Sequence, residues 1–109
     1  MKFKINGVQW EIKFVDNKTI TNIYNREFGT ELNFLYGVTL YPHSLILINK
    51  DIEKQQQIHT LKHELTHCYI WQTGIYHVDK FDDEMVCDLV ASSNNFINEI
   101  VEKVQKRWE

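Results

Sequence analysis

The chain has little that would interrupt a folded domain, since it contains one proline and four glycines in 109 residues. It has no linker rich in proline or glycine, no internal repeat and no low-complexity tract. A hydrophobic content of 43%, with 13% aromatic residues, is enough to build a core without disulfides or other cross-links. We therefore expect a single domain over residues 1–109.

The sequence also lacks an excess of positive charge, because its formal net charge is −3 at pH 7. Nucleic-acid binders concentrate basic charge, so a direct nucleic-acid partner is not expected. No apolar leader follows Met1-Lys2, and no run approaches the roughly 20 apolar residues of a membrane span. These absences predict a cytoplasmic protein that does not contact a membrane, and they leave the oligomeric state open.

Cysteine is scarce as well, with Cys68 and Cys87 as the only two. They fall in two predicted helices that we expect to face each other. In a reducing compartment, the expectation is two buried small apolar side chains rather than a disulfide.

The N-terminal segment alternates apolar and polar residues on both sides of Asn6-Gly7. This dipeptide is typical of type I′ turns, so Lys2–Ile5 and Val8–Val15 are predicted to form a β-hairpin. Its core side is expected to carry Phe3, Ile5, Val8, Trp10, Ile12 and Phe14. The following segment, Asp16 to Phe28, is ambiguous, with a short helix ending near Gly29 as one interpretation.

Two more strands are predicted on either side of Pro42-His43, over Phe34–Tyr41 and Ser44–Asn49. Gly37 within the first indicates a bulge or a close approach of another element. The sequence leaves open whether the second strand lies at an edge of the sheet or at its centre.

A long helix is predicted over residues 52–73, because the segment has no glycine or proline and stops at Gly74. Asp51 is its expected N-cap. Its apolar residues recur at spacings of three and four, which places an apolar stripe on one side and His63 and His67 on the other. The stripe consists of Ile58, Leu61, Leu65, Cys68 and Tyr69.

This helix contains His63-Glu64-Leu65-Thr66-His67, an example of the pattern HExxH. Residues four apart lie on one face of a helix, so the two imidazoles converge as ligands for Zn²⁺. A catalytic zinc site takes three protein ligands and keeps one position open for water. Glu64 is the expected catalytic base, which takes a proton from that water.

The third ligand is expected on a second helix, which is predicted from about Asp79 to Arg107. Glu84 is the preferred candidate, and Asp88, one turn later, would orient a ligand histidine by accepting a hydrogen bond from its ring. His77 and Asp83 remain alternatives to Glu84. Acidic residues in the first turn of a helix are also favoured without any metal. The sequence does not indicate which residue would stabilise the oxyanion of the tetrahedral intermediate.

These motifs resemble the gluzincins, zinc peptidases in which HExxH is completed by a glutamate on a later helix. More narrowly, the chain resembles the ImmA/IrrE metallopeptidase family over about Asp51 to Asn98. That family's second motif is glutamate, two variable residues, alanine, asparagine, a variable residue, an aromatic residue and alanine. Residues 84–91 match it at Glu84 and Ala91 and depart from it at Cys87, Asp88 and Val90.

The resemblance implies His63, His67 and Glu84 as ligands, Glu64 as base, and hydrolysis of a peptide bond in a protein substrate. It further implies a phage or mobile-element setting, with a helix-turn-helix repressor as a possible substrate. The expected fold is α+β and zincin-like, with a small antiparallel or mixed sheet of three to four strands, the HExxH helix and a long C-terminal helix. The alternatives are a non-catalytic zinc-binding regulatory protein on the same scaffold, and an accidental motif on an interaction surface.

Overall fold

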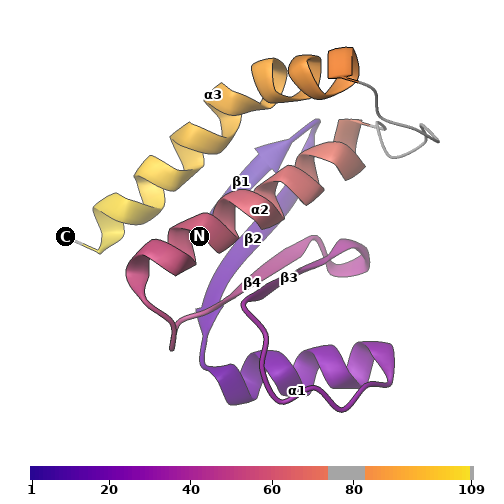
Figure 1. Cartoon of the computed structure of the whole chain (residues 1–109), viewed down its shortest axis with the longest axis vertical. Helices are drawn as coiled ribbons and strands as arrows, with labels where there is room; N and C mark the ends of the chain where they lie inside the picture. The colour runs from indigo at the N-terminus through magenta and orange to yellow at the C-terminus, as the bar shows by residue number, and fades with distance from the viewer. Residues whose placement is uncertain (74–82, 109) are drawn as a thin grey trace.

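The computed structural model describes residues 1–73 and 83–108, and for Asp83, Glu84 and Asp88 it describes the backbone alone. It confirms the predicted α+β class, with a mixed four-stranded sheet, three α-helices and a long C-terminal helix (Figure 1). The elements along the chain are β1 (Lys2–Ile5), β2 (Val8–Val15), α1 (Asn17–Phe28), β3 (Gly37–Leu40), the 3-10 turn η1 (Tyr41–His43), β4 (Leu45–Asn49), α2 (Lys54–Thr73) and α3 (Asp83–Arg107).

The predicted hairpin is present, with β1 antiparallel to β2. Asn6 and Gly7 both have positive φ, 53° and 80°, which is the requirement of a type I′ turn. The sheet order is β1-β2-β4-β3, with β2 parallel to β4 and β3 antiparallel to it. The strand β4 is therefore central, and β3 is an edge strand.

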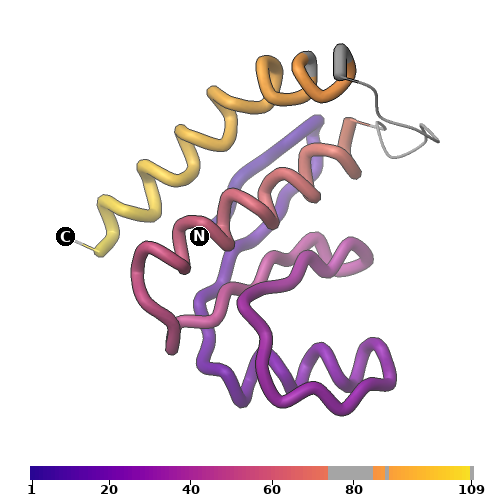
Figure 2. The backbone as a smooth tube through the Cα atoms, in the orientation of Figure 1, coloured from indigo at the N-terminus to yellow at the C-terminus, as the bar shows by residue number. Residues whose placement is uncertain are grey.

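The ambiguous segment after the hairpin is a helix, α1, with caps at both ends. The Asp16 side chain accepts a hydrogen bond from the Thr19 backbone, and Gly29 ends the helix with φ 64° and donates to the Asn25 carbonyl. The next segment runs back along α1 before it turns into β3 (Figure 2).

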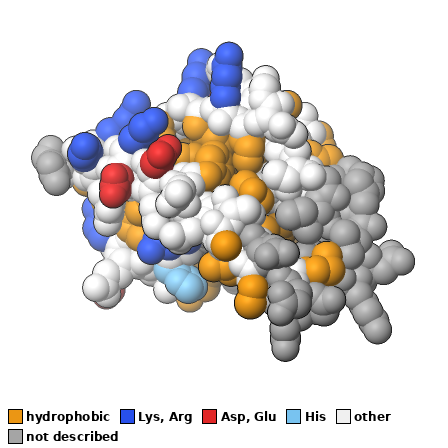
Figure 3. Space-filling view, turned by 90° about the horizontal axis from the view of Figure 1, so that it is seen from above, with side chains coloured by type: hydrophobic (Ala, Val, Ile, Leu, Met, Phe, Trp, Pro, Cys, Tyr) orange, Lys and Arg blue, Asp and Glu red, His pale blue; other side chains and the backbone are white. Residues whose placement is uncertain are grey.

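The two faces of the sheet are covered by different helices (Figure 1). Helices α2 and α3 cover one face of the sheet, and the core between them and the sheet consists of Trp10, Ile12, Ile46, Ile48, Leu61, Leu65, Cys68, Ile97, Ile100, Val101 and Val104. The α1 face is smaller and packs around Ile20, Val38, Leu40 and Leu47. Seen from above, the molecule carries lysine and arginine side chains toward one end, with acidic ones among them (Figure 3). Within residues 1–73 and 83–108, no helix has the length and apolar content that a membrane crossing requires.

Three strand predictions need correction. Val8 was expected in the core but is 37% exposed, because it follows directly on the Asn6-Gly7 turn, at the tip of the hairpin. The strand predicted over Phe34–Tyr41 is only Gly37–Leu40, since residues 34–36 precede it without strand structure and Tyr41 begins η1. The strand predicted over Ser44–Asn49 begins at Leu45, because Ser44 closes that turn in the left-handed conformation, at φ 48°.

The start of α2 also differs from the prediction. The helix begins at Lys54, and Asp51 does not cap it. Instead, the Asp51 carboxylate accepts a hydrogen bond of 2.8 Å from the backbone of Asn17, at the start of α1. The amide of Gln57 donates to the carbonyls of Lys50 and Ile52, at 3.2 and 2.8 Å, which holds this segment as a turn before the helix. The predicted start of α3 near Asp79 lies outside the described residues.

Candidate metal centre

The HELTH motif lies in the middle of α2, where the helix is fixed at both ends. Gln57 holds its entry, and near its C-terminus the Gln72 side chain accepts a hydrogen bond of 2.7 Å from the indole of Trp10 on β2. Leu61, Leu65 and Cys68 are fully buried on the sheet side, while His63 and His67 are exposed, as the helical spacing predicted. These contacts fix which face of α2 is turned toward the sheet and which toward solvent.

The Nε2 atoms of His63 and His67 lie 3.1 Å apart, with ring centroids at 4.8 Å. Without a metal, this distance is a hydrogen bond in which one ring donates and the other accepts. At metal–nitrogen distances of about 2.0 to 2.1 Å, two nitrogens this far apart subtend roughly 95 to 102° at the metal, near the tetrahedral angle of about 109°. The two imidazoles therefore fit a shared zinc ion as neighbouring ligands.

Glu64 is buried, at only 7% exposed. A carboxylate in such a place needs a hydrogen-bond donor, because its desolvation is otherwise uncompensated. Thr39 on β3 provides the donor, since its Oγ1 lies 2.8 Å from Glu64 Oε1 and 3.3 Å from the Glu64 carbonyl oxygen. The hydrogen bond from β3 thus fixes the orientation of the Glu64 side chain.

Tyr41 also belongs to the surroundings of Glu64. Burial raises the pKa of its phenol, and the negative charge of Glu64 raises this pKa further. Its ring is tilted on that of Trp71, with centroids 4.7 Å apart. The phenol therefore keeps its proton at neutral pH and remains a hydrogen-bond donor.

A hollow of about 430 Å³ lies between α2 and the beginning of β3. His63 and Glu64 line it together with Leu35, Tyr36, Gly37, Gln56, His59 and Thr60. Gly37 explains how the strand reaches the helix, because a Cβ at this position would lie 2.6 Å from Thr60 Cγ2. The predicted close approach at Gly37 is confirmed, and the motif borders a space large enough for a side chain.

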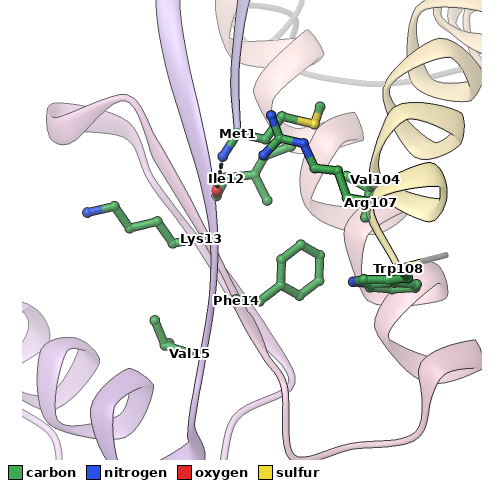
Figure 4. A pocket seen from close by; sticks show the side chains of 8 residues that line it. All are labelled: Met1, Ile12, Lys13, Phe14, Val15, Val104, Arg107 and Trp108. Carbon is green, nitrogen blue, oxygen red and sulfur yellow. Dashed lines mark hydrogen bonds between the residues drawn. The ribbon is translucent and has the colours of Figure 1, made fainter.

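A second hollow, of about 370 Å³, lies between β2 and the end of α3 (Figure 4). Phe14 and Trp108 point into it, and their rings meet edge to face at 5.5 Å. The Met1 ammonium, close by, donates to the Ile12 carbonyl at 2.9 Å. No residue of HELTH lines this space, so it is separate from the histidine pair.

The position of the proposed third ligand can be described only by its backbone. Glu84 and Asp88 belong to the first turns of α3, as does Asp83, and their side chains lie outside the described residues. The helix runs antiparallel to α2 (Figure 1), and Thr66 shares a surface hollow with Leu89 and Val90. The second turn of α3 therefore lies beside Thr66, within the motif.

Among the described residues, no group of three histidine, cysteine or acidic side chains is arranged to hold a metal ion. The described part of the chain contributes two candidate ligands, His63 and His67, and the third stays a prediction. His77, an alternative third ligand, falls outside the described residues.

The two cysteines differ in exposure, which corrects the prediction that both are buried. Cys68 is fully buried behind the motif, but Cys87 is exposed, since the described residues of α3 that pack in the core begin at Phe96. Both are free thiols.

Thr39 and Tyr41 were not predicted as site residues. Thr39 follows Gly37 at even spacing, which places it on the α2 side of β3, and this alternation is its only signal in the sequence. Tyr41 comes after the strand, in η1, where alternation does not apply. The alternation becomes informative only when the strand is known to lie beside α2.

The fold and site define an α+β protein in which a helical pair of histidines stands beside a buried carboxylate held by an edge strand. No family model matches the chain, and comparisons with curated proteins and with solved structures give no match either.

Proposed function

We propose that this chain is a zinc-dependent endopeptidase of the gluzincin type. The observation that carries the proposal is the convergence of two Nε2 atoms, 3.1 Å apart, beside a buried carboxylate of fixed orientation. Two nitrogen ligands and a base at this spacing are three of the four protein groups that metal-assisted hydrolysis of this type requires. The resemblance to the ImmA/IrrE metallopeptidases supports the same chemistry.

His63, His67 and Glu84 would hold the ion, and Asp88 would orient one of the histidine rings. When bound, zinc lowers the pKa of a coordinated water toward about 7 and polarises a carbonyl oxygen. The support for Glu84 from α3 is its place in the helix, five residues before Leu89, which shares a surface hollow with Thr66 of the motif.

Glu64 is the general base in this proposal. It takes a proton from the attacking water as the new C–O bond forms, and it returns the proton to the leaving amine as the C–N bond breaks. The hydrogen bond from Thr39 engages Oε1, so the second carboxylate oxygen serves the proton transfer. The buried setting of Glu64 keeps the carboxylate in one orientation.

The substrate backbone would bind along the free edge of β3, adding a strand to the sheet. The Asn49 backbone donates to the Tyr36 carbonyl at 2.9 Å, and hydrogen-bonded pairs alternate along an antiparallel ladder. The N–H and C=O groups of Gly37 and Thr39 therefore point to the outer edge, where no described strand pairs with them. These groups supply main-chain hydrogen bonds to an extended polypeptide.

The proposed substrate is a protein, with a helix-turn-helix repressor as the class that the resemblance implies, and the proposed setting is the cytoplasm of a bacterial cell carrying a phage or mobile element. The reducing cytoplasm agrees with two free cysteines.

The test compares the zinc-loaded wild-type chain with Glu64→Gln on a proteome-derived peptide library, read by mass spectrometry. We expect new peptide ends with the wild type, and a rate lower by about 10²- to 10⁴-fold with the variant, at equal zinc content. Equal cleavage by both proteins would overturn the role of Glu64. A library left intact by the zinc-loaded wild type would favour the non-catalytic regulatory alternative.

A further inference from the structure

Three large apolar side chains stand exposed in one short segment beside the candidate site. Leu32, Phe34 and Tyr36 are 44, 45 and 52% exposed, and the rings of Phe34 and Tyr36 meet edge to face at 5.0 Å. We call these three residues the apolar rim. Scattered exposed apolar residues are ordinary, but a contiguous group marks a surface that another molecule covers.

The backbone beneath the apolar rim is held by asparagine side chains. Asn25 bonds both the N–H and the C=O of Leu32, at 2.9 and 2.8 Å. Asn17 donates to the Asn33 carbonyl, and Asn49 donates to the Leu35 carbonyl, each at 2.9 Å. A segment fixed in this way presents its side chains without a large ordering cost on binding.

The apolar rim leads directly into the proposed substrate edge. Tyr36 lines the hollow with His59, Thr60 and His63, and the next residue, Gly37, has outward-pointing backbone groups. In a sheet, paired residues on neighbouring strands place their side chains on the same face. A polypeptide residue paired with Gly37 therefore directs its side chain into this hollow, and one paired with Thr39 lies beside Glu64.

We infer that the apolar rim and the hollow form a side-chain subsite that selects an extended polypeptide with a bulky apolar residue opposite Gly37. This residue lies two positions from the one opposite Thr39, whichever direction the polypeptide runs. Leu35 and Tyr36 line the β3 side of the hollow, and no charged side chain occurs from Leu32 to Tyr36, so an apolar side chain, aromatic or branched aliphatic, matches this side. The polar residues of the lining, His59, His63 and Glu64 among them, belong to α2. The inference rests on the proposed binding of substrate along β3.

The test measures binding to Glu64→Gln loaded with zinc, which retains the surface without turnover. The probes are fluorescein-labelled extended peptides in which one position is Phe, Leu, Ala, Asp or Lys. Burial of a large apolar side chain predicts that the Phe and Leu peptides bind about 10-fold or more tightly than the Ala peptide. The double variant Phe34→Ser and Tyr36→Ser, in the same background, should bind all five peptides alike.

The matched control is Phe28→Ser, which removes a ring of similar exposure, 54%, at the C-terminus of α1, outside the lining of the hollow. It should keep the preference for Phe and Leu. An equal loss in this control, or no preference among the peptides, overturns the inference. A concentration-dependent dimer that the rim variant abolishes also overturns it, because the rim would then bind a second copy of the chain.

The two proposals fail in different ways. If the wild type cleaves peptides without any preference for Phe or Leu, the subsite is wrong and the peptidase stands. If the zinc-loaded protein neither binds nor cleaves any peptide, both the proposed function and the subsite fall.

Discussion

The Thr39 hydroxyl donates a hydrogen bond of 2.8 Å to the Glu64 carboxylate, which joins the edge strand β3 to the helix that carries both histidines. The two residues are 25 positions apart in sequence. Because Glu64 is buried and Thr39 belongs to a paired strand, the sheet sets the orientation of the carboxylate. A change at Thr39 should therefore reach the site without touching a proposed zinc ligand.

Thr39→Val replaces the hydroxyl by a methyl group of similar size and leaves Glu64 without its donor. We expect the free energy of unfolding to fall by about 1 to 3 kcal/mol, as measured by urea denaturation. Peptide hydrolysis should fall while zinc affinity stays unchanged. Thr39→Ser keeps the hydroxyl and is the matched control. If the Val and Ser variants are equally stable and equally active, the hydrogen bond does not position Glu64.

Gly37→Ala tests the contact between β3 and α2. The added Cβ would lie 2.6 Å from Thr60 Cγ2 and 3.1 Å from the Leu47 carbonyl oxygen, and Thr60 is buried. Overpacking of this kind predicts a loss of about 1 to 3 kcal/mol in thermal or urea unfolding. Adding Thr60→Ser removes the clashing methyl and should restore part of the loss. A Gly37→Ala chain as stable as the wild type would contradict the close approach.

Asn49→Leu tests the polar anchor below the apolar rim. Asn49 is fully buried, donates to Asn17 and Leu35, and accepts from the Asp51 backbone at 2.8 Å. Its loss leaves these partners unpaired, so we expect destabilisation on the order of 3 kcal/mol. Asn98→Leu removes an exposed bond of 3.4 Å and should change stability by less than about 0.5 kcal/mol. Similar unfolding curves for both variants would show that the anchor is unimportant.

The two thiols should differ in reactivity. Burial raises the pKa of the Cys68 thiol to about 12, and the thiolate is the reactive form. At about pH 8 we expect iodoacetamide to modify Cys87 alone in the folded chain, and both thiols in denaturant, as counted by mass spectrometry. Rapid modification of Cys68 in the folded chain would contradict its burial.

The same shift affects stability at alkaline pH. The folded state holds the Cys68 proton more tightly than the unfolded state, whose thiol keeps its ordinary pKa of 9.0. This contribution to stability is complete below that value, declines above it and is lost as the pH passes the folded value of about 12. Cys68→Ala should flatten this decline when unfolding is measured across the alkaline range.

Much of the fold follows from local signals in the sequence. Asn-Gly between alternating runs predicts the hairpin, and Asn6 and Gly7 have the required positive φ. The spacing of His63 and His67 predicts convergent rings, which the structure contains. In each case the signal and the structure lie within a few residues, so no distant contact is needed to interpret them.

The rest depends on pairing between distant segments. Asp51 resembles an N-cap of α2, yet its carboxylate bonds Asn17, 34 positions earlier, because the tertiary fold brings the two turns together. The position of β4 at the centre of the sheet, and with it the free edge of β3, depends on strand order. Thr39 could not be assigned to the site from sequence because its contact with Glu64 depends on the same order.

The most direct test of the account is the zinc affinity and stoichiometry of the purified chain at neutral pH, measured by calorimetric titration with elemental analysis. We predict one zinc per chain for the wild type and Glu64→Gln. The affinity should fall by more than about 100-fold for His63→Ala, His67→Ala and Glu84→Gln, and little for Asp83→Asn. A wild type that retains no zinc, or histidine variants that bind it as tightly as the wild type, would contradict the central claim.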